Sequence, residues 1–111
     1  MKKLLITVAL VASTTANAYY VEHLPCSSVA LHAEAIMRAR QAGVPLSKML
    51  EIARKGDNMP LNASSEEMVI DAYGFNVYTY ESVKQKAISG FRDFAERRCL
   101  KLEAAAKGGG V

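Results

Sequence analysis

Apolar residues recur along this chain at helical spacing, in four stretches separated by glycine, proline or short polar segments. The first stretch predicts a helix that begins at Ser27 or Ser28, either of which can act as the N-cap, and runs to about Ala42. Gly43 follows at the position where a left-handed residue ends many helices. The apolar face of this helix carries Val29, Ala33, Ile36 and Met37.

The next two stretches predict shorter helices. Residues 46–55 match the i, i+3, i+4, i+7 template at four apolar positions, and Gly56 ends the run. Residues 57–63 contain asparagine and proline and are expected to form the longest loop. A third helix is expected over 64–73, because a serine there precedes a glutamate by three residues, the capping-box pattern, and Gly74 ends it.

The fourth and longest helix is expected over residues 80–106, with Thr79 as its cap. The side chains expected to point inward are Tyr80, Val83, Ala87, Phe91, Phe94, Ala95 and Leu102, with Ile88 and Cys99 on one flank. No stretch alternates as a strand would. The sequence therefore predicts an all-α fold, a small four-helix bundle-like domain with short loops.

Residues 1–18 are typical of a secretory signal peptide. Lys2 and Lys3 form the positive start, residues 4–12 are apolar except for one threonine, and an Ala-Asn-Ala cleavage site ends at Ala18. A buried N-terminal helix and an uncleaved signal anchor are the alternatives. The apolar run is shorter than the roughly 20 residues that a membrane span needs, so no stable span is expected after cleavage. The mature part, residues 19–111, is then one helical domain with a flexible tail from about residue 104.

Cleavage of the signal peptide also changes the net charge of the chain. The chain has 14 Lys and Arg, of which Lys2 and Lys3 leave with the leader, so the mature part has 12 against 11 Asp and Glu, a net charge of +1. No patch of basic residues interleaved with aromatic ones remains. Nucleic acid is therefore not an expected partner.

The two cysteines, Cys26 and Cys99, both lie in the mature part. One disulfide is the simplest interpretation for an exported chain, and two separate buried thiols are the alternative. In an up-down-up-down bundle, the start of the first helix and the end of the fourth lie at the same pole, so a bridge would join them. Closing a loop of this length stabilises a fold by about 4 kcal/mol in the chain-entropy relation.

Catalytic and metal-binding patterns are missing from the sequence. The only histidines, His23 and His32, have no partner at metal-ligand spacing, and no serine lies in a nucleophile motif. His32 flanks the apolar stripe of the first helix and is expected to be a boundary residue between its buried and exposed faces. We therefore expect no cofactor, no metal and no enzymatic activity.

Four residues are candidates for binding a partner. Arg98 falls near the centre of the expected apolar stripe of the fourth helix, where it either extends its guanidinium to water or presents it to an acidic partner. Tyr73, Phe75 and Tyr78 belong to a cluster of aromatic residues around the turn between the third and fourth expected helices. Ordinary packing is one interpretation of that cluster, and an exposed contact surface of the kind common in protein interfaces is the other.

Parts of the chain resemble an uncharacterised family of small secreted helical proteins found in phages, prophages and proteobacterial genomes. The resemblance lies in residues 33–51, with their Arg-Gln-x-Gly-Val-Pro-x-Ser core, in 68–73 and in 87–94, followed by Cys99. It implies an architecture and a context but no catalytic residues. The chain departs from the family pattern at residues 95–98, where an aromatic pair often precedes the last cysteine.

Together these observations predict an exported, non-enzymatic interaction protein of the periplasm, a phage-derived modulator of an envelope target, whose protein partner the sequence does not identify. One alternative is a holdase, because the chain is similar in kind to the small acid-stress chaperones of the enterobacterial periplasm. Its carboxylates would titrate mostly below about pH 5. The other alternative is a lysis or superinfection regulator that keeps its N-terminal segment as a signal anchor.

Overall fold

The computed structural model describes residues 19–21, 23–55 and 62–108, with only the backbone for 62–64. These residues form four helices, α1 (Cys26–Gln41), α2 (Leu46–Lys55), α3 (Asn62–Ala72) and α4 (Glu81–Gly108). The described part of the chain contains no strand, which confirms the all-α prediction. The expected signal peptide over 1–18 and the expected stop at Gly56 lie outside the described residues.

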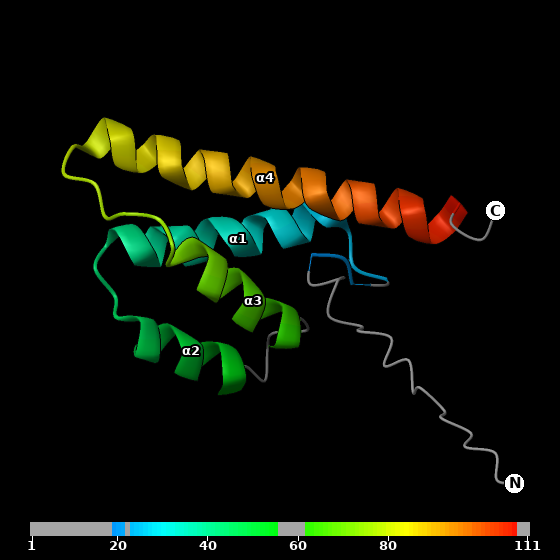
Figure 1. Cartoon of the computed structure of the whole chain (residues 1–111), viewed down its shortest axis with the longest axis horizontal. Helices are drawn as coiled ribbons and strands as arrows, with labels where there is room; N and C mark the ends of the chain where they lie inside the picture. The colour runs from blue at the N-terminus through cyan, green and yellow to red at the C-terminus, as the bar shows by residue number, and fades with distance from the viewer. Residues whose placement is uncertain (1–18, 22, 56–61, 109–111) are drawn as a thin grey trace, which may run out of the picture.

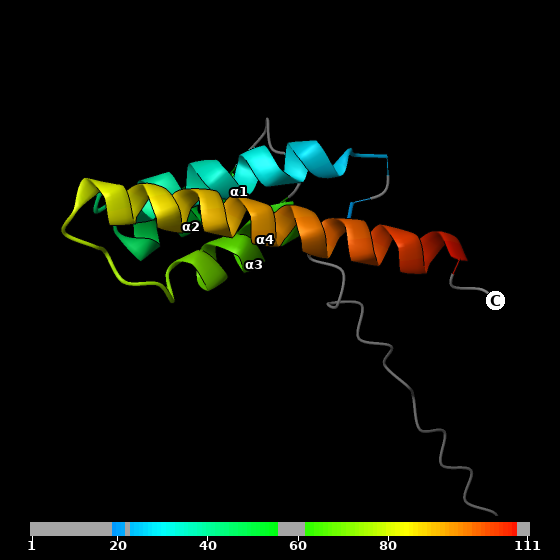
Figure 2. The same ribbon diagram turned by 90° about the horizontal axis from the view of Figure 1, so that it is seen from above.

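Helix α1 is the centre of the fold. It packs against each of the other three helices, and it lies between α4 and the hairpin formed by α2 and α3 (Figure 1). The view from above shows α1 and α4 running alongside each other (Figure 2). They are antiparallel, because Cys26 at the start of α1 is bonded to Cys99 near the end of α4. The chain thus follows the expected up-down-up-down path, with one central helix rather than a square of four.

The ends of α1 show one correct prediction and one wrong one. Pro25, not a serine, is the N-cap, and the carbonyl oxygen of Pro25 accepts hydrogen bonds from the backbone N–H groups of Ser28 and Val29. The helix therefore begins before the serines can act as caps. At the other end Gly43 has φ 88° and ends the helix as expected. Its N–H bonds to Arg40 O, and the next N–H bonds to Ala39 O, which is the Schellman pattern.

Helices α3 and α4 are both longer than expected. Helix α3 begins at Asn62, inside the segment expected to be a loop, and the side chains of the expected capping box are not all described. Helix α4 continues through residues 104–107, where the sequence suggested a flexible tail. An ion pair between Glu103 and Lys107, with 3.7 Å between the nitrogen and the oxygen, lies along this last part of α4.

The core is built largely from small and aliphatic residues of α1, α3 and α4. Its members include Val29, Ala33, Ile36, Met37, Met49, Met68, Val69, Ile88, Phe91 and Ala95. The expected inward stripe of α4 was correct for Phe91 and Ala95, which are buried, and for Ala87 and Leu102, which pack against the core. It was wrong for its other three members. Ile88, Phe91, Ala95 and Cys99 are buried, whereas Tyr80, Val83 and Phe94 are exposed. The reason is that α1 and the disulfide fix which side of α4 faces inward, and hydrophobicity alone does not show this.

The disulfide between Cys26 and Cys99 confirms the expected pairing. Both cysteines are buried, their Cα atoms lie 5.6 Å apart, and 73 residues separate them in sequence. Such a bridge is compatible with an oxidising compartment. It joins the first turn of α1 to the second half of α4, so both ends of the folded domain are held together.

Candidate interaction site

The connection between α3 and α4 is held by the last turn of α1. The buried side chain of Gln41 donates to the carbonyl oxygen of Asn76 at 2.7 Å and accepts from the backbone N–H of Tyr78 at 2.9 Å. The carbonyl oxygen of Gln41 accepts a hydrogen bond from Lys84 Nζ at 2.9 Å. Gln41 thus holds the connection through its side chain and the start of α4 through its backbone carbonyl oxygen.

Tyr73 is held by the same segment. Its hydroxyl donates to the carbonyl oxygen of Val44 at 2.7 Å, and the Arg40 guanidinium lies 5.0 Å from the centre of its ring. Arg40 Nε also donates to the carbonyl oxygen of Phe75 at 2.9 Å. Burial raises the pKa of Tyr73, and Arg40 partly opposes this shift. Tyr73 therefore contributes to the fold, as does the backbone of Tyr78, although both were predicted as partner-binding residues.

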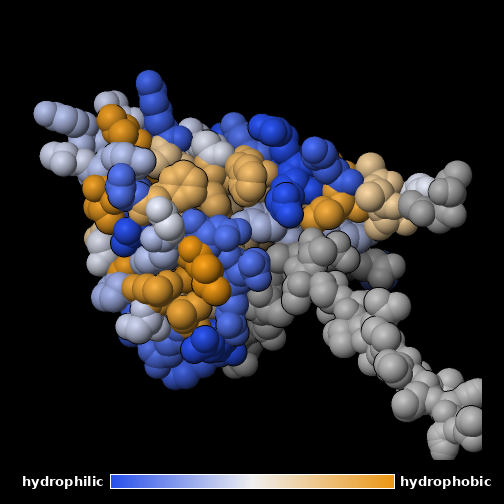
Figure 3. Space-filling model, viewed as in Figure 1, coloured by the Kyte–Doolittle hydropathy of each residue, from blue (hydrophilic) through white to orange (hydrophobic). Residues whose placement is uncertain are grey.

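Phe75 belongs to a row of four aromatic rings. Its ring meets Phe91 edge-on with 5.8 Å between centroids, Phe91 stacks on Phe94 at 6.3 Å, and Phe94 meets Tyr19 edge-on at 5.9 Å. Phe91 and Tyr19 are buried, while Phe75 and Phe94 are 39% and 43% exposed. On the face that Figure 3 shows, apolar side chains gather over the middle of α4 and over the α2–α3 hairpin.

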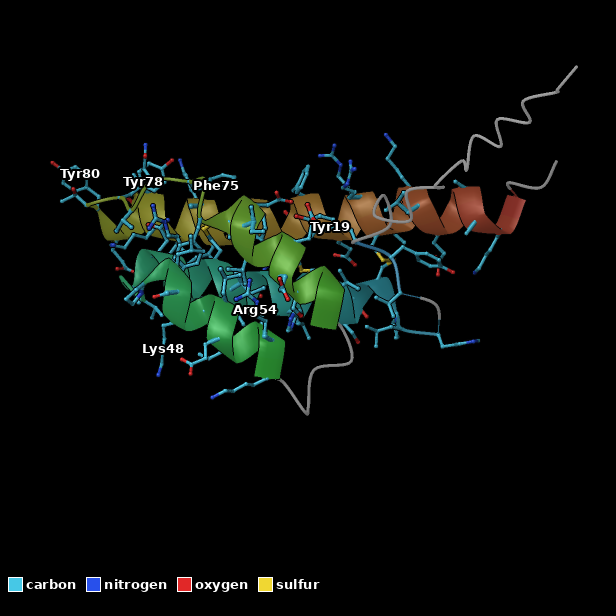
Figure 4. All side chains as sticks on the ribbon, turned by 60° about the horizontal axis from the view of Figure 1, so that its bottom comes forward. Tyr19, Lys48, Arg54, Phe75, Tyr78 and Tyr80 are labelled. Carbon is cyan, nitrogen blue, oxygen red and sulfur yellow. A yellow bond between two sulfur atoms is a disulfide. The ribbon has the colours of Figure 1, made fainter. Side chains whose placement is uncertain are left out.

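Tyr19 ends this row, although it precedes the first helix by seven residues. Its hydroxyl donates a hydrogen bond to Asp71 of α3, and the Arg98 guanidinium lies 5.8 Å from its ring centroid. Burial and Asp71 together raise the pKa of Tyr19 well above its ordinary value. Figure 4 shows Tyr19 and Phe75 at two points along α4, on the side that faces α3. The lead-in segment thus joins α3 to α4.

Of the four residues expected to bind a partner, two lie at opposite ends of this aromatic row. Phe75 is at one end, and Arg98 is beside Tyr19 at the other. The sequence placed Tyr19, with Tyr20, in the wider group of suggestive aromatic residues but did not single it out as a site residue, because aromatic residues outside any helix carry no periodic signal. Phe94 was assigned to the core, and only the direction of the buried stripe of α4 shows that its ring is partly exposed.

His32 and Ser65 form a second polar contact between helices. His32 Nε2 lies 2.6 Å from Ser65 Oγ and joins α1 to α3, with the imidazole half-buried and the serine fully buried. Burial lowers the pKa of His32, so its neutral form is favoured. A serine beside a histidine is the arrangement of an activated nucleophile. Here the serine has no exposed surface, so a substrate has no path to it while α1 and α3 are packed together.

Two further features concern ions and membranes. Within the described residues, no group of histidine, cysteine and carboxylate side chains is placed to hold a metal ion. No helix among those residues has the length and apolar character needed to cross a bilayer.

A depression of about 570 Å³ lies between the lead-in segment and the end of α4, lined by residues that include His23, Pro25 and Glu103. It is separate from the aromatic row.

Comparisons with known proteins add no relative: no protein-family model, no curated protein and no solved structure matches this chain.

Proposed function

We propose that this chain is an exported, non-enzymatic protein of the periplasm that acts by binding another protein of the envelope. The observation that carries the proposal is the aromatic row along α4, in which Phe75 and Phe94 keep about two fifths of their surface exposed although both rings pack against buried rings. Partly exposed aromatic side chains on a fixed backbone are typical of interface anchors.

The polar groups of the interior support a surface function. Every described buried side-chain nitrogen or oxygen has a hydrogen-bond partner, so none is left to recognise a ligand inside the fold. The polar side chains of Gln41, His32 and Ser65 form hydrogen bonds that hold elements of the fold together. Export and the phage context are proposed from residues 1–18 and from the family resemblance.

The test is crosslinking in the periplasm followed by co-purification of the full chain. Phe75→Ala and Phe94→Ala should each reduce recovery of the partner several-fold, because the exposed edges of the row are lost. Leu31→Ala is the matched control, since Leu31 is an apolar residue of α1 with 65% of its surface exposed. Equal recovery with all three variants would show that the aromatic row is not the binding site. Recovery of no partner would contradict the proposed function.

An acid-activated holdase is the second candidate, because the half-buried His32 lies between α1 and α3. Protonation of His32 would weaken this contact and loosen the hairpin. The disulfide would still tie α1 to α4, so we expect a folded domain at pH 4 without a gain in holdase activity. Near-ultraviolet circular dichroism and a client-aggregation assay at pH 7 and about pH 3 separate the two candidates. Lost tertiary signal together with suppressed aggregation would favour the holdase.

A further inference from the structure

The exposed positively charged side chains of the described helices fall into two groups. In the first group, each side chain has a carboxylate partner: Arg38, Arg54, Lys55, Arg92 and Lys107. The second group makes no ion pair in the described structure: Lys48 on α2 and Lys86 early in α4 stand apart from each other, whereas Arg97, Arg98 and Lys101 lie close together. Three positive charges without carboxylate partners thus lie within five residues of α4.

These three residues share a helix face with an exposed aromatic ring. Phe94, Arg97, Arg98 and Lys101 stand at i, i+3, i+4 and i+7, and together they line a depression of about 130 Å³. Figure 3 shows the apolar side chains over the middle of α4 giving way to strongly hydrophilic ones toward its C-terminal end. The aromatic row therefore ends in a group of positive charges.

The carboxylates of α3 do not neutralise this face through ion pairs. Asp71 accepts the hydrogen bond of the Tyr19 hydroxyl, and Arg98 lies over the Tyr19 ring instead of pairing with Asp71. Glu67 is close enough to influence Tyr19 but makes no ion pair with Arg97, Arg98 or Lys101 in the described structure. No carboxylate among the described residues therefore pairs with these three side chains.

We propose that this face, residues 94, 97, 98 and 101, binds an acidic polypeptide segment that also carries an apolar side chain. The apolar side chain packs on the exposed edge of Phe94, and carboxylates pair with the two guanidinium groups, whose planar shape suits bidentate contacts. A polypeptide fits better than a lipid surface, because lipid-binding clusters usually contain about four to eight basic residues. This inference rests on the proposed function and names the chemistry of its partner.

The test uses a fluorescein-labelled peptide, Gly-Asp-Glu-Phe-Glu-Asp-Gly, and fluorescence anisotropy with the oxidised full chain. A second peptide replaces each acid with its amide, and a third replaces phenylalanine with alanine. We expect the acidic phenylalanine peptide to bind about tenfold more tightly than either control peptide, since several exposed ion pairs and one apolar contact are lost. Raising the salt from about 50 mM to about 500 mM should weaken its binding.

The informative variant is Arg97→Glu with Lys101→Glu, because neither side chain makes an ion pair or hydrogen bond in the described structure and the fold should persist. We expect it to bind the acidic peptide about tenfold more weakly than the unmodified chain. The matched control, Lys48→Glu with Lys86→Glu, changes the net charge equally at exposed positions elsewhere and should bind within about twofold of the unmodified chain.

Several results would overturn the inference. They are equal affinity of the Arg97→Glu/Lys101→Glu variant, equal binding of the amide peptide, charge-dependent binding to anionic vesicles without peptide binding, and a dimer in sedimentation that the variant abolishes. The proposed function can be judged separately. If crosslinking recovers a partner that still binds this variant, the function stands and only the site is wrong. If no partner is recovered, the proposed function itself fails.

Discussion

The α1–α4 pair and the α2–α3 hairpin are held in different ways. A buried disulfide ties α1 to α4 at one end, and at the other end Lys84 bonds to the last carbonyl oxygen of α1. Apart from its backbone connections, the hairpin is attached to the rest of the described structure by non-covalent contacts, including the bonds from His32 to Ser65 and from Tyr73 to Val44. We therefore expect the hairpin to open more easily than the α1–α4 pair, which holds Phe91 and Phe94, the two central rings of the aromatic row.

Removal of the disulfide should have the largest effect on stability, because the disulfide is the covalent cross-link that holds α1 to α4. We expect the double variant Cys26→Ala/Cys99→Ala to lose about 4 kcal/mol in the free energy of unfolding, from the entropy that the unfolded chain regains. Urea unfolding measures this loss. A loss below about 1 kcal/mol would show that packing, and not the bridge, distinguishes the two regions.

Met68→Ala should weaken the hairpin by about 3 kcal/mol, because the Met68 side chain is fully buried and its loss leaves a cavity. Met49→Ala, at a site with 8% exposure, is the comparison and should cost less. Hydrogen exchange resolved by residue is the informative measurement. Faster exchange in α2 and α3 with unchanged exchange in α1 and α4 would support independent opening, and equal acceleration throughout would contradict it.

Gln41→Ala should cost about 2 kcal/mol, because it leaves the backbone groups of Asn76 and Tyr78 without their partner. Gln85→Ala is the matched control: Gln85 donates to Glu81 one turn away on the exposed surface and should change stability by less than about 0.5 kcal/mol. Thermal unfolding of both variants checks the difference. Equal effects would mean that Gln41 does not hold the connection before α4.

Helix positions, the stop at Gly43 and the disulfide could be predicted from the sequence, because each depends on local spacing or on the number of cysteines. The direction of α4 could not, since Phe94 and Ile88 are both apolar and only packing against α1 decides which one is buried. The contacts of Gln41, His32 and Tyr19 join residues between 33 and 52 positions apart. Single-sequence periodicity carries no information about such pairs.

The hairpin should also be sensitive to pH through His32. Burial holds the pKa of His32 below its ordinary value near 6.5, which the unfolded chain keeps. Below about pH 6.5 the unfolded chain therefore binds a proton that the folded chain does not, and stability falls as the pH drops. The fall ends once the pH passes the folded pKa and both states bind the proton.

Urea unfolding between about pH 7.5 and pH 5 tests this prediction. In the His32→Gln variant the loss should be smaller than in the unmodified chain. His23→Asn is the control, because His23 is exposed and has φ 71°, a conformation that asparagine adopts readily. An unchanged pH dependence in His32→Gln would assign the acid sensitivity to the carboxylates instead.

Tyr19→Phe should have the smallest effect and shows what holds the lead-in segment. The ring contact with Phe94 remains and only the hydrogen bond to Asp71 is lost, so we expect a cost of about 1 kcal/mol or less at pH 7. Because the fold raises the pKa of Tyr19 above 10, the unfolded chain loses its phenol proton first as the pH rises, and the folded state becomes less stable above about pH 10. The phenylalanine variant cannot ionise there and should keep more of its stability than the unmodified chain. Unfolding at pH 7 and at about pH 10.5 measures both effects, and a larger loss for the variant at the higher pH would show that the Tyr19 hydroxyl is not buried against α3.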